Sequence, residues 1–199
     1  MQHKPKPAPN ALPKPSAVER KVLMNTTLNP VSQGVSSTLR IFQADYANPV
    51  HISALMTLLD GYARDPMGGG EPLSDHARQN LPQALAARPA MFSVLALDEA
   101  QGDLPVGLVN CIEGFSTFAC QPLVNVHDVV VAATHRGQRV AQQMLVLVEQ
   151  LALARGACKL TLEVLAGNAP AQKLYRRMGF DNYQLDPAMG NAQFMQKYL

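Results

Sequence analysis

The sequence predicts a mixed α/β fold in which a central mixed sheet of about seven strands is flanked by about four helices. Segments that alternate apolar and polar residues, as half-buried strands do, are interspersed with segments that repeat apolar residues every three or four positions, as helices do. Between residues 123 and 166 a strand, a long helix and another strand follow one another, which is typical of a right-handed parallel crossover. Hydrophobic residues make up 47% of the 199 residues, enough to bury the core of one domain.

The first predicted elements are a strand and two helices. Residues 38–46 alternate in polarity and predict the first strand. Apolar side chains recur at helical spacing from about residue 49 to 63, and the Gly-rich segment 67–70 breaks this pattern. Ser74 can cap a second helix that extends to about residue 87.

Three strands are predicted next. Residues 91–100 and 105–116 are joined by a polar, Gly-containing loop, so they should be antiparallel neighbours. Residues 123–133 form a long β-branched segment with few charges, as expected of a central strand covered on both faces.

The C-terminal part is predicted to contain the remaining helices and strands. Residues 137–155 repeat apolar side chains at helical spacing, residues 158–166 predict a strand, and residues 168–179 predict a short helix. Two closing strands are predicted around Tyr183 and around residues 194–195.

Charge and proline content separate a tail from the domain. Residues 1–36 contain six of the 15 prolines and carry a formal charge of +4, whereas the rest of the chain carries −2. We expect residues 1–36 to be a disordered, proline-rich basic tail, either a tether or a dispensable leader, and residues 37–199 to form one domain.

Composition also disfavours several classes of protein. The mildly acidic domain lacks the clustered Lys and Arg that nucleic-acid binding needs, and no apolar stretch has the length of a signal peptide core or a membrane span. Cys111, Cys120 and Cys158 form no C-x-x-C pair and have no His at metal-ligand spacing. We therefore expect free thiols in a cytoplasmic protein with no metal, no nucleic-acid partner and no membrane partner.

The junction between the strand at residues 123–133 and the next helix is the sharpest chemical feature. A short basic loop leads into the helix start, where unpaired N–H groups and the helix dipole favour an anion, and Arg136 and Arg139 add positive charge. The patterns of nucleotide-binding P-loops and of dinucleotide-binding loops are both missing. The junction is therefore either a phosphate or pyrophosphate site of another kind or a basic surface turn.

Two blocks resemble the GNAT superfamily of acyl-CoA-dependent N-acyltransferases. Residues 136–141 fit the family's loop pattern Gln/Arg-x-x-Gly-x-Gly/Ala, with Arg139 in place of the usual glycine. The segment GNAPAQKLYRRMGF matches a second family pattern at Asn168, Ala171, Tyr175, Arg177, Gly179 and Phe180. The resemblance covers about residues 38–199 and is nearest to the branch that acetylates small amines and polyamines.

The resemblance implies acetyl-CoA as the acyl donor and no metal. It implies that the pantetheine arm adds in a strand-like manner to the strand before the loop, and that the pyrophosphate binds amides at the helix start. The cofactor-binding residues that it implies are Val129, Val130, Val131, Arg136, Gly137, Gln138, Arg139, Val140, Ala141, Gln142, Asn168 and Ala171.

The resemblance also implies that Tyr175 is the general acid that protonates the departing thiolate, because a phenol keeps its proton at neutral pH. From its spacing alone, Tyr175 is a core aromatic. The first candidate for the general base is His127, since histidines ordinarily titrate near neutrality, and a core histidine is the alternative. The rival candidates for the base are Asp128, Glu113 and Glu163.

Residues that bind the acceptor are expected mainly in the loop after the first predicted helix. Tyr62, Asp65, Glu71 and the neighbouring glycines would form a mobile wall, with Phe115 and Phe118 opposite. The acidic residues would favour a cationic amine, and an ordinary solvated turn is the alternative.

The sequence therefore predicts an enzyme that transfers an acetyl group from acetyl-CoA to a primary amine of a small molecule by direct attack in a ternary complex. A free Cys in a strand is usually a small core residue, so a route through an acylated cysteine is disfavoured. Acetylation of a protein N-terminus or lysine is one alternative, and a non-catalytic acyl-CoA sensor is another. A homodimer is possible.

Overall fold

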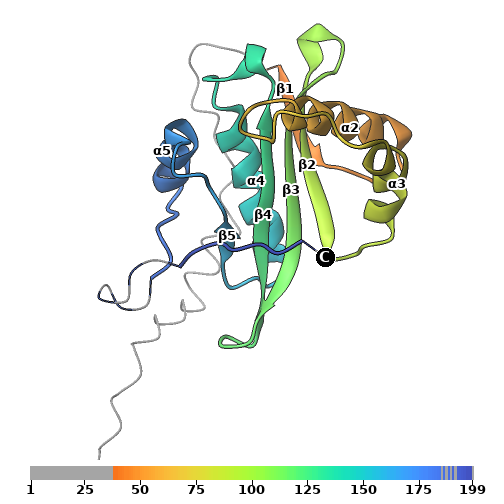
Figure 1. Cartoon of the computed structure of the whole chain (residues 1–199). Helices are drawn as coiled ribbons and strands as arrows, with labels where there is room; N and C mark the ends of the chain where they lie inside the picture. The colour runs from red at the N-terminus through yellow and green to blue at the C-terminus, as the bar shows by residue number, and fades with distance from the viewer. Residues whose placement is uncertain (1–37, 185, 187, 189, 191, 199) are drawn as a thin grey trace, which may run out of the picture. The chain divides into compact units, whose positions relative to one another are not determined.

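In the computed structural model, the strands of the described chain form a five-stranded mixed sheet in the order β1-β2-β3-β4-β5 (Figure 1). The structure describes residues 38–184, 186, 188, 190 and 192–198, so the predicted tail, residues 1–36, lies outside it. Neighbouring strands from β1 to β4 are antiparallel, and β4 and β5 are parallel. The strands are β1 (Leu39–Gln43), β2 (Met91–Asp98), β3 (Leu104–Ser116), β4 (Gln121–Val131) and β5 (Leu160–Leu162), and the helices are α2 (Pro49–Ala63), α3 (Asp75–Ala86), α4 (Val140–Ala154) and α5 (Ala169–Arg177).

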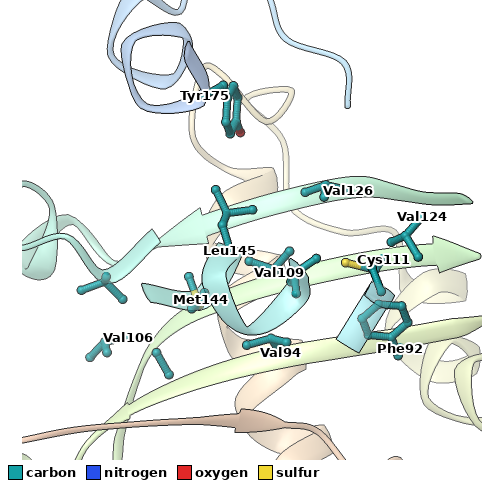
Figure 2. Packing of buried hydrophobic residues seen from close by; sticks show 14 residues of the cluster. Phe92, Val94, Val106, Val109, Cys111, Val124, Val126, Met144, Leu145 and Tyr175 are labelled. Carbon is teal, nitrogen blue, oxygen red and sulfur yellow. The ribbon is translucent and has the colours of Figure 1, made fainter. Parts of the chain in front are cut away.

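Helices cover both faces of the sheet, as predicted. Along β2, Phe92, Val94 and Ala96 belong to the core cluster that includes the buried face of α4 (Figure 2). The intervening Leu95 and Leu97 belong to a second cluster, which includes the buried face of α2. Because successive side chains of a strand point to opposite faces, this alternation places one core on each side of the sheet.

The predicted helices are confirmed with small changes at their ends. Asn48 and Ser74 accept hydrogen bonds from backbone N–H groups in the first turns of α2 and α3, as N-caps do. α4 starts at Val140 and not at the predicted Gly137, because Gly137 and Arg139 have φ values of 78° and 63°. These left-handed conformations are incompatible with a continuous right-handed helix.

A β-bulge in β4 changes which side chains face each helix layer. Asn110 pairs with Asp128, but the next residue of β3, Cys111, pairs with Val126, so His127 has no partner on β3. An extra residue of this kind bends the strand and redirects its side chains. His127 is exposed, whereas Asp128 is half-buried.

The two predicted closing strands were wrong for the part of the C-terminal segment that the structure describes. No strand forms between residue 181 and residue 198 there, and Tyr183, Phe194 and Met195 are exposed. Asp181 and Asp186 bond instead to nearby backbone N–H groups of residues 182 and 188. Such local bonds compete with strand pairing. Among the described residues of this segment, the N–H of residue 192 donates to the carbonyl of Tyr183 (3.1 Å).

The described residues contain no cluster of metal ligands and no helix that could cross a membrane. Their His, Cys, Asp and Glu side chains form no group of three or more that could hold a metal ion. None of their helices combines the length and the apolar character that crossing a membrane requires.

Candidate active site

β4 has an open edge close to the start of α4. One edge of β4 pairs with β3 along its length, but β5 pairs with β4 only at residues 124–126. Within the described chain, no strand pairs with the second edge of residues 127–131. The predicted cofactor residues Val129, Val130 and Val131 lie on this stretch, where free backbone groups can bind an extended ligand by strand addition.

The start of α4 presents free backbone N–H groups. No side chain caps this helix, and within residues 38–198 as described the N–H groups of residues 137–142 have no hydrogen-bond acceptor. A Cβ at Gly137 would meet no atom within 4 Å, so the space beside the loop is open. Free N–H groups and the positive end of a helix dipole fit the pyrophosphate of acetyl-CoA.

Arg139 occupies the position where the family pattern has glycine. Its φ of 63° lies in the left-handed region that glycine adopts at little cost, and it precedes the first residue of α4. The loop therefore keeps its left-handed turn without the glycine, and the arginine side chain is exposed.

Replacing Arg139 by glycine should relieve backbone strain. A side chain in the left-handed region costs about 1–2 kcal/mol, of which the greater flexibility of glycine in the unfolded chain offsets up to about 1 kcal/mol. Arg139→Gly is therefore expected to raise the free energy of unfolding by up to about 1 kcal/mol in a urea titration. Cys120→Gly is the matched control, because Cys120 has a φ of 50° in the distant β3–β4 turn. A loss of stability in Arg139→Gly alone would contradict this interpretation.

Arg136 links the loop before α4 to the loop after α2. Its Nε donates to the carbonyl of Val131 (3.2 Å), and its Nη2 donates to Oδ2 of Asp65 (2.9 Å). The N–H of Met67 donates to the other oxygen of Asp65, and these two hydrogen bonds lower the pKa of Asp65. The structure thus places Asp65, which was predicted to bind the acceptor, beside the loop that was predicted to bind the cofactor.

Tyr175 lies on α5, and its ring extends toward β4 (Figure 2). Asn168 caps α5 by accepting a hydrogen bond from the N–H of Ala171 (3.2 Å), so both predicted cofactor residues have a structural role. The ring of Tyr175 packs edge-on against Phe180 and is 9% exposed. Burial raises the pKa of Tyr175 to about 12, with a smaller contribution from Tyr62. Because of this raised pKa, the phenol keeps its proton at neutral pH. Its hydroxyl has no hydrogen-bond partner among the described residues, so it is free to donate.

A buried chain of hydrogen bonds leads to Asp128 on the face of the sheet that α2 covers. The hydroxyl groups of Tyr46 and Ser93 are 2.8 Å apart, and Ser93 Oγ donates to Oδ1 of Asn110 (2.6 Å). Nδ2 of Asn110 then donates to Oδ2 of Asp128 (2.9 Å). The Asp128 carboxylate is therefore held in one orientation at the open stretch of β4.

Tyr62 is affected by the charges of both carboxylates of the site. Its pKa is raised by burial first, then by the charges of Asp128 and Asp65. Its hydroxyl donates to the carbonyl of Met67 (3.3 Å), which ties the end of α2 to the following loop. Tyr62, Asp65 and Asp128 thus form a polar wall with two carboxylates, of which Asp65 is balanced by Arg136.

Other predicted site residues are not brought to this wall. His127 is exposed at the bulge, and Glu71 is exposed in the loop after α2. Phe115 lies five positions beyond Asn110 along β3, about 16 Å away at the usual rise of a strand, and is exposed like Phe118. The two rival glutamates are engaged elsewhere: Glu113 is 3.7 Å from Arg155, and Glu163 accepts from Asn125 (3.2 Å).

The cysteines do not contribute to the site. Burial raises the pKa of the Cys111 thiol to about 12, so it is not a thiolate at neutral pH. Cys120 and Cys158 are exposed, and all three are free thiols.

Sequence analysis missed five residues that organise the site. Tyr46, Ser93 and Asn110 build the chain to Asp128, and Asp98 and His135 form a buried pair next to the loop before α4. One signal was present, because Ser93 and Asn110 are single polar residues within apolar strands. Buried polar groups of this kind need hydrogen-bond partners.

Comparisons with known proteins show which family and fold this chain resembles. Residues 54–180 match the family described as the acetyltransferase (GNAT) family. Streptothricin acetyltransferases of Streptomyces lavendulae and Escherichia coli are 37% and 33% identical over 87 and 98 residues, which are 42% and 46% of this chain and 46% and 55% of theirs. The chain thus spans about half the length of these curated relatives. A crystal structure described as that of a probable acetyltransferase is 24% identical, with a TM-score of 0.67 over 80% of this chain and 99% of that chain.

Proposed function

The chain belongs to the acetyltransferase (GNAT) family, and we propose that it transfers an acetyl group from acetyl-CoA to a primary amine of a small molecule by direct attack in a ternary complex. The observation that carries this proposal is the open edge of β4 beside the uncapped start of α4. Tyr175 extends toward the same strand (Figure 2). The open edge of β4 fits the extended arm of the thioester, and the uncapped start of α4 fits an anion. The phenol of Tyr175 can protonate the leaving thiolate.

Acetyl-CoA supplies the acetyl group as an activated thioester. Backbone groups of residues 129–131 would hydrogen-bond the pantetheine arm, and the N–H groups of residues 137–142 would hold the pyrophosphate. Nε of Arg136 donates to the carbonyl of Val131, so this hydrogen bond has to break when the pantetheine arm binds there, while Nη2 can keep its bond to Asp65. The guanidinium of Arg136 then lies close to the pyrophosphate loop.

Two side chains would handle protons during the transfer. The attacking amine must lose a proton, and Asp128 is the carboxylate that the chain from Tyr46 to Asn110 holds at the open stretch of β4. We propose Asp128 as the general base, in place of the exposed His127. Tyr175 would donate its phenolic proton to the thiolate as the bond between the acetyl carbon and sulfur breaks.

The carboxylates also favour a cationic acceptor. Asp65 is paired with Arg136, whereas Asp128 forms no salt bridge within the described chain, so the charge of Asp128 attracts a protonated amine before it loses its proton. The Asp65–Arg136 ion pair draws the loop after α2 toward the cofactor loop, which favours a small molecule over an extended peptide. The similarity to streptothricin acetyltransferases supports the same class of acceptor.

CoA should stabilise the chain through the loop before α4. A ligand that binds only the folded state at about 100 times its Kd adds about 2.7 kcal/mol, or roughly 5–10 °C in Tm for a domain of this size. Gly137→Val should abolish this shift in a thermal denaturation assay, because a side chain there covers the free amides. Gly156→Val is the matched control, since Gly156 also has a positive φ (74°) and open space, at the other end of α4. No shift with the unmodified chain would contradict the proposal.

The acceptor class can be tested by following thiol release from acetyl-CoA. Streptothricin, spermidine and a peptide with a free N-terminus and a lysine form a suitable panel. We expect turnover with the small cationic amines and little with the peptide. Preference for the peptide would favour a protein acetyltransferase, and CoA binding without turnover on a wide panel would favour a sensor.

A further inference from the structure

The proposed chemistry leaves one buried polar pair unused. Ser93, Asp98, Asn110 and His135 are the buried polar or charged residues of the described chain. Ser93 and Asn110 serve Asp128, whereas Nε2 of His135 lies 3.2 Å from Oδ2 of Asp98. Asp98 ends β2, and His135 lies in the short turn Ala133–His135 between β4 and α4. The pair therefore ties the turn before α4 to the far end of a core strand.

Asp98 is held from several sides. Its carboxylate accepts hydrogen bonds from Thr38 Oγ1 (2.8 Å), the N–H of Ala100 (3.0 Å), the side chain of Gln101 and His135. The bonds from Thr38, Gln101 and His135 lower its pKa to about 2, so the carboxylate is ionised at neutral pH. A carboxylate is only an acceptor, so His135 Nε2 carries the proton in this hydrogen bond.

His135 is the single buried residue of segment 132–139. The backbone N–H of His135 donates to the carbonyl of Ala132 (2.8 Å), and the ring atom Nδ1 lies 2.9 Å from Thr134 Oγ1. Gly137, where the free amides begin, follows two positions later. Every residue from Arg136 to Arg139 is exposed, so the His135 side chain is the buried anchor that precedes these amides, as Val140 is the buried residue that follows the exposed loop.

We propose that the buried His135–Asp98 pair is a positioning device that preorganises the amides of residues 137–142 for the pyrophosphate of CoA. This inference rests on the proposed function. A buried polar pair contributes little more to stability than apolar residues of the same volume, so stability alone does not account for it. A loop already held in its bound conformation loses less freedom on binding, and the benefit appears as ligand affinity.

Two substitutions at position 135, whose amide groups reach different distances, distinguish a role in positioning from a role in folding. Asparagine at position 135 places its amide near the position of Nδ1 and cannot reach Asp98, whereas glutamine places its amide near the position of Nε2 and can donate to Asp98. His135→Asn should weaken CoA binding about tenfold by isothermal titration and raise the KM for acetyl-CoA equally, with kcat unchanged. His135→Gln should restore most of the affinity. Acetyl-pantetheine, which lacks the pyrophosphate, should react equally well with all three proteins.

Thr38→Val is the matched control, because it removes another hydrogen bond to Asp98 and leaves His135 in place. It should lower Tm about as much as His135→Asn does and leave CoA affinity unchanged. Equal CoA affinity in the asparagine variant and the unmodified chain would overturn the inference, as would an equal loss with Thr38→Val. If the unmodified chain itself fails to bind CoA, the proposed function is overturned first, and the inference with it.

Discussion

Asp128→Asn should lower kcat for amine acetylation by about a hundredfold or more, the usual contribution of a general base. The asparagine side chain has the same shape and keeps an oxygen that can accept the hydrogen bond from Asn110, so the folded chain should keep its stability. An amide cannot take the proton of the attacking amine at neutral pH. The measurement is steady-state kinetics with an accepted amine from the panel, together with a urea titration of each protein.

The rival candidates for the base provide the controls for this experiment. His127→Gln should change kcat less than about twofold, because the imidazole is exposed on the bulge and forms no hydrogen bond with another described residue. Glu113→Gln and Glu163→Gln should behave in the same way, since their carboxylates face Arg155 and Asn125. A normal rate in Asp128→Asn with a large loss in His127→Gln would instead assign the base to His127.

The orientation of Asp128 depends on a residue that never reaches the open edge. Asn110 can present either its oxygen or its nitrogen to Asp128, and a carboxylate, which only accepts hydrogen bonds, requires the nitrogen. Because Nδ2 of Asn110 donates to Asp128, Oδ1 of Asn110 is left to accept the hydrogen bond from Ser93 Oγ. Since the Ser93 hydroxyl donates its one proton to Asn110, the Tyr46 hydroxyl, in the turn between β1 and α2, must donate to Ser93, and the chain has one consistent direction from Tyr46 to Asp128. Such networks are costly unless every member is satisfied, and here each one is.

Most helices and strands could be predicted from interactions between residues that are close in the sequence. Ser74 predicted the start of α3 because its side chain caps the helix through a neighbouring N–H, an interaction that spans three residues. The alternation in polarity along residues 38–46 predicted β1 because successive side chains of a strand point to opposite faces of the sheet. The closing strands failed because strand pairing needs a distant partner, and at Asp181 and Asp186 bonds to adjacent N–H groups form instead.

Candidate site residues could be named from the sequence where they belong to one short segment, and they were missed where they depend on strand register. The loop at residues 136–141 and Tyr175 are each contained in a short motif. The choice between His127 and Asp128 depends on a bulge, and a bulge is a property of β3 and β4 together. The same holds for the His135–Asp98 pair, whose members lie 37 positions apart.

Tyr175→Phe should lower kcat by about a hundredfold and change stability little. The hydroxyl of Tyr175 has no hydrogen-bond partner within the described chain, so its removal breaks no hydrogen bond of the folded state. The ring keeps its edge-on contact with Phe180 and its place beside Leu174 and Met178 in the core cluster. Because burial raises the pKa of Tyr175 to about 12, the unmodified chain should show no loss of rate from ionisation of this phenol between pH 6 and about 10.

The pattern of kinetic constants tests whether the phenol acts in the transition state. Loss of a proton donated only as the thiolate departs lowers kcat and leaves the KM for acetyl-CoA nearly unchanged. Tyr183→Phe is the matched control, since this tyrosine is exposed beside Lys159 and should be replaceable without effect. A core aromatic with no chemical role predicts the opposite result: normal turnover in Tyr175→Phe, and damage only in Tyr175→Ala, where the missing ring opens a cavity. Unaltered kcat in Tyr175→Phe would therefore remove Tyr175 from the reaction and leave protonation of the thiolate to water.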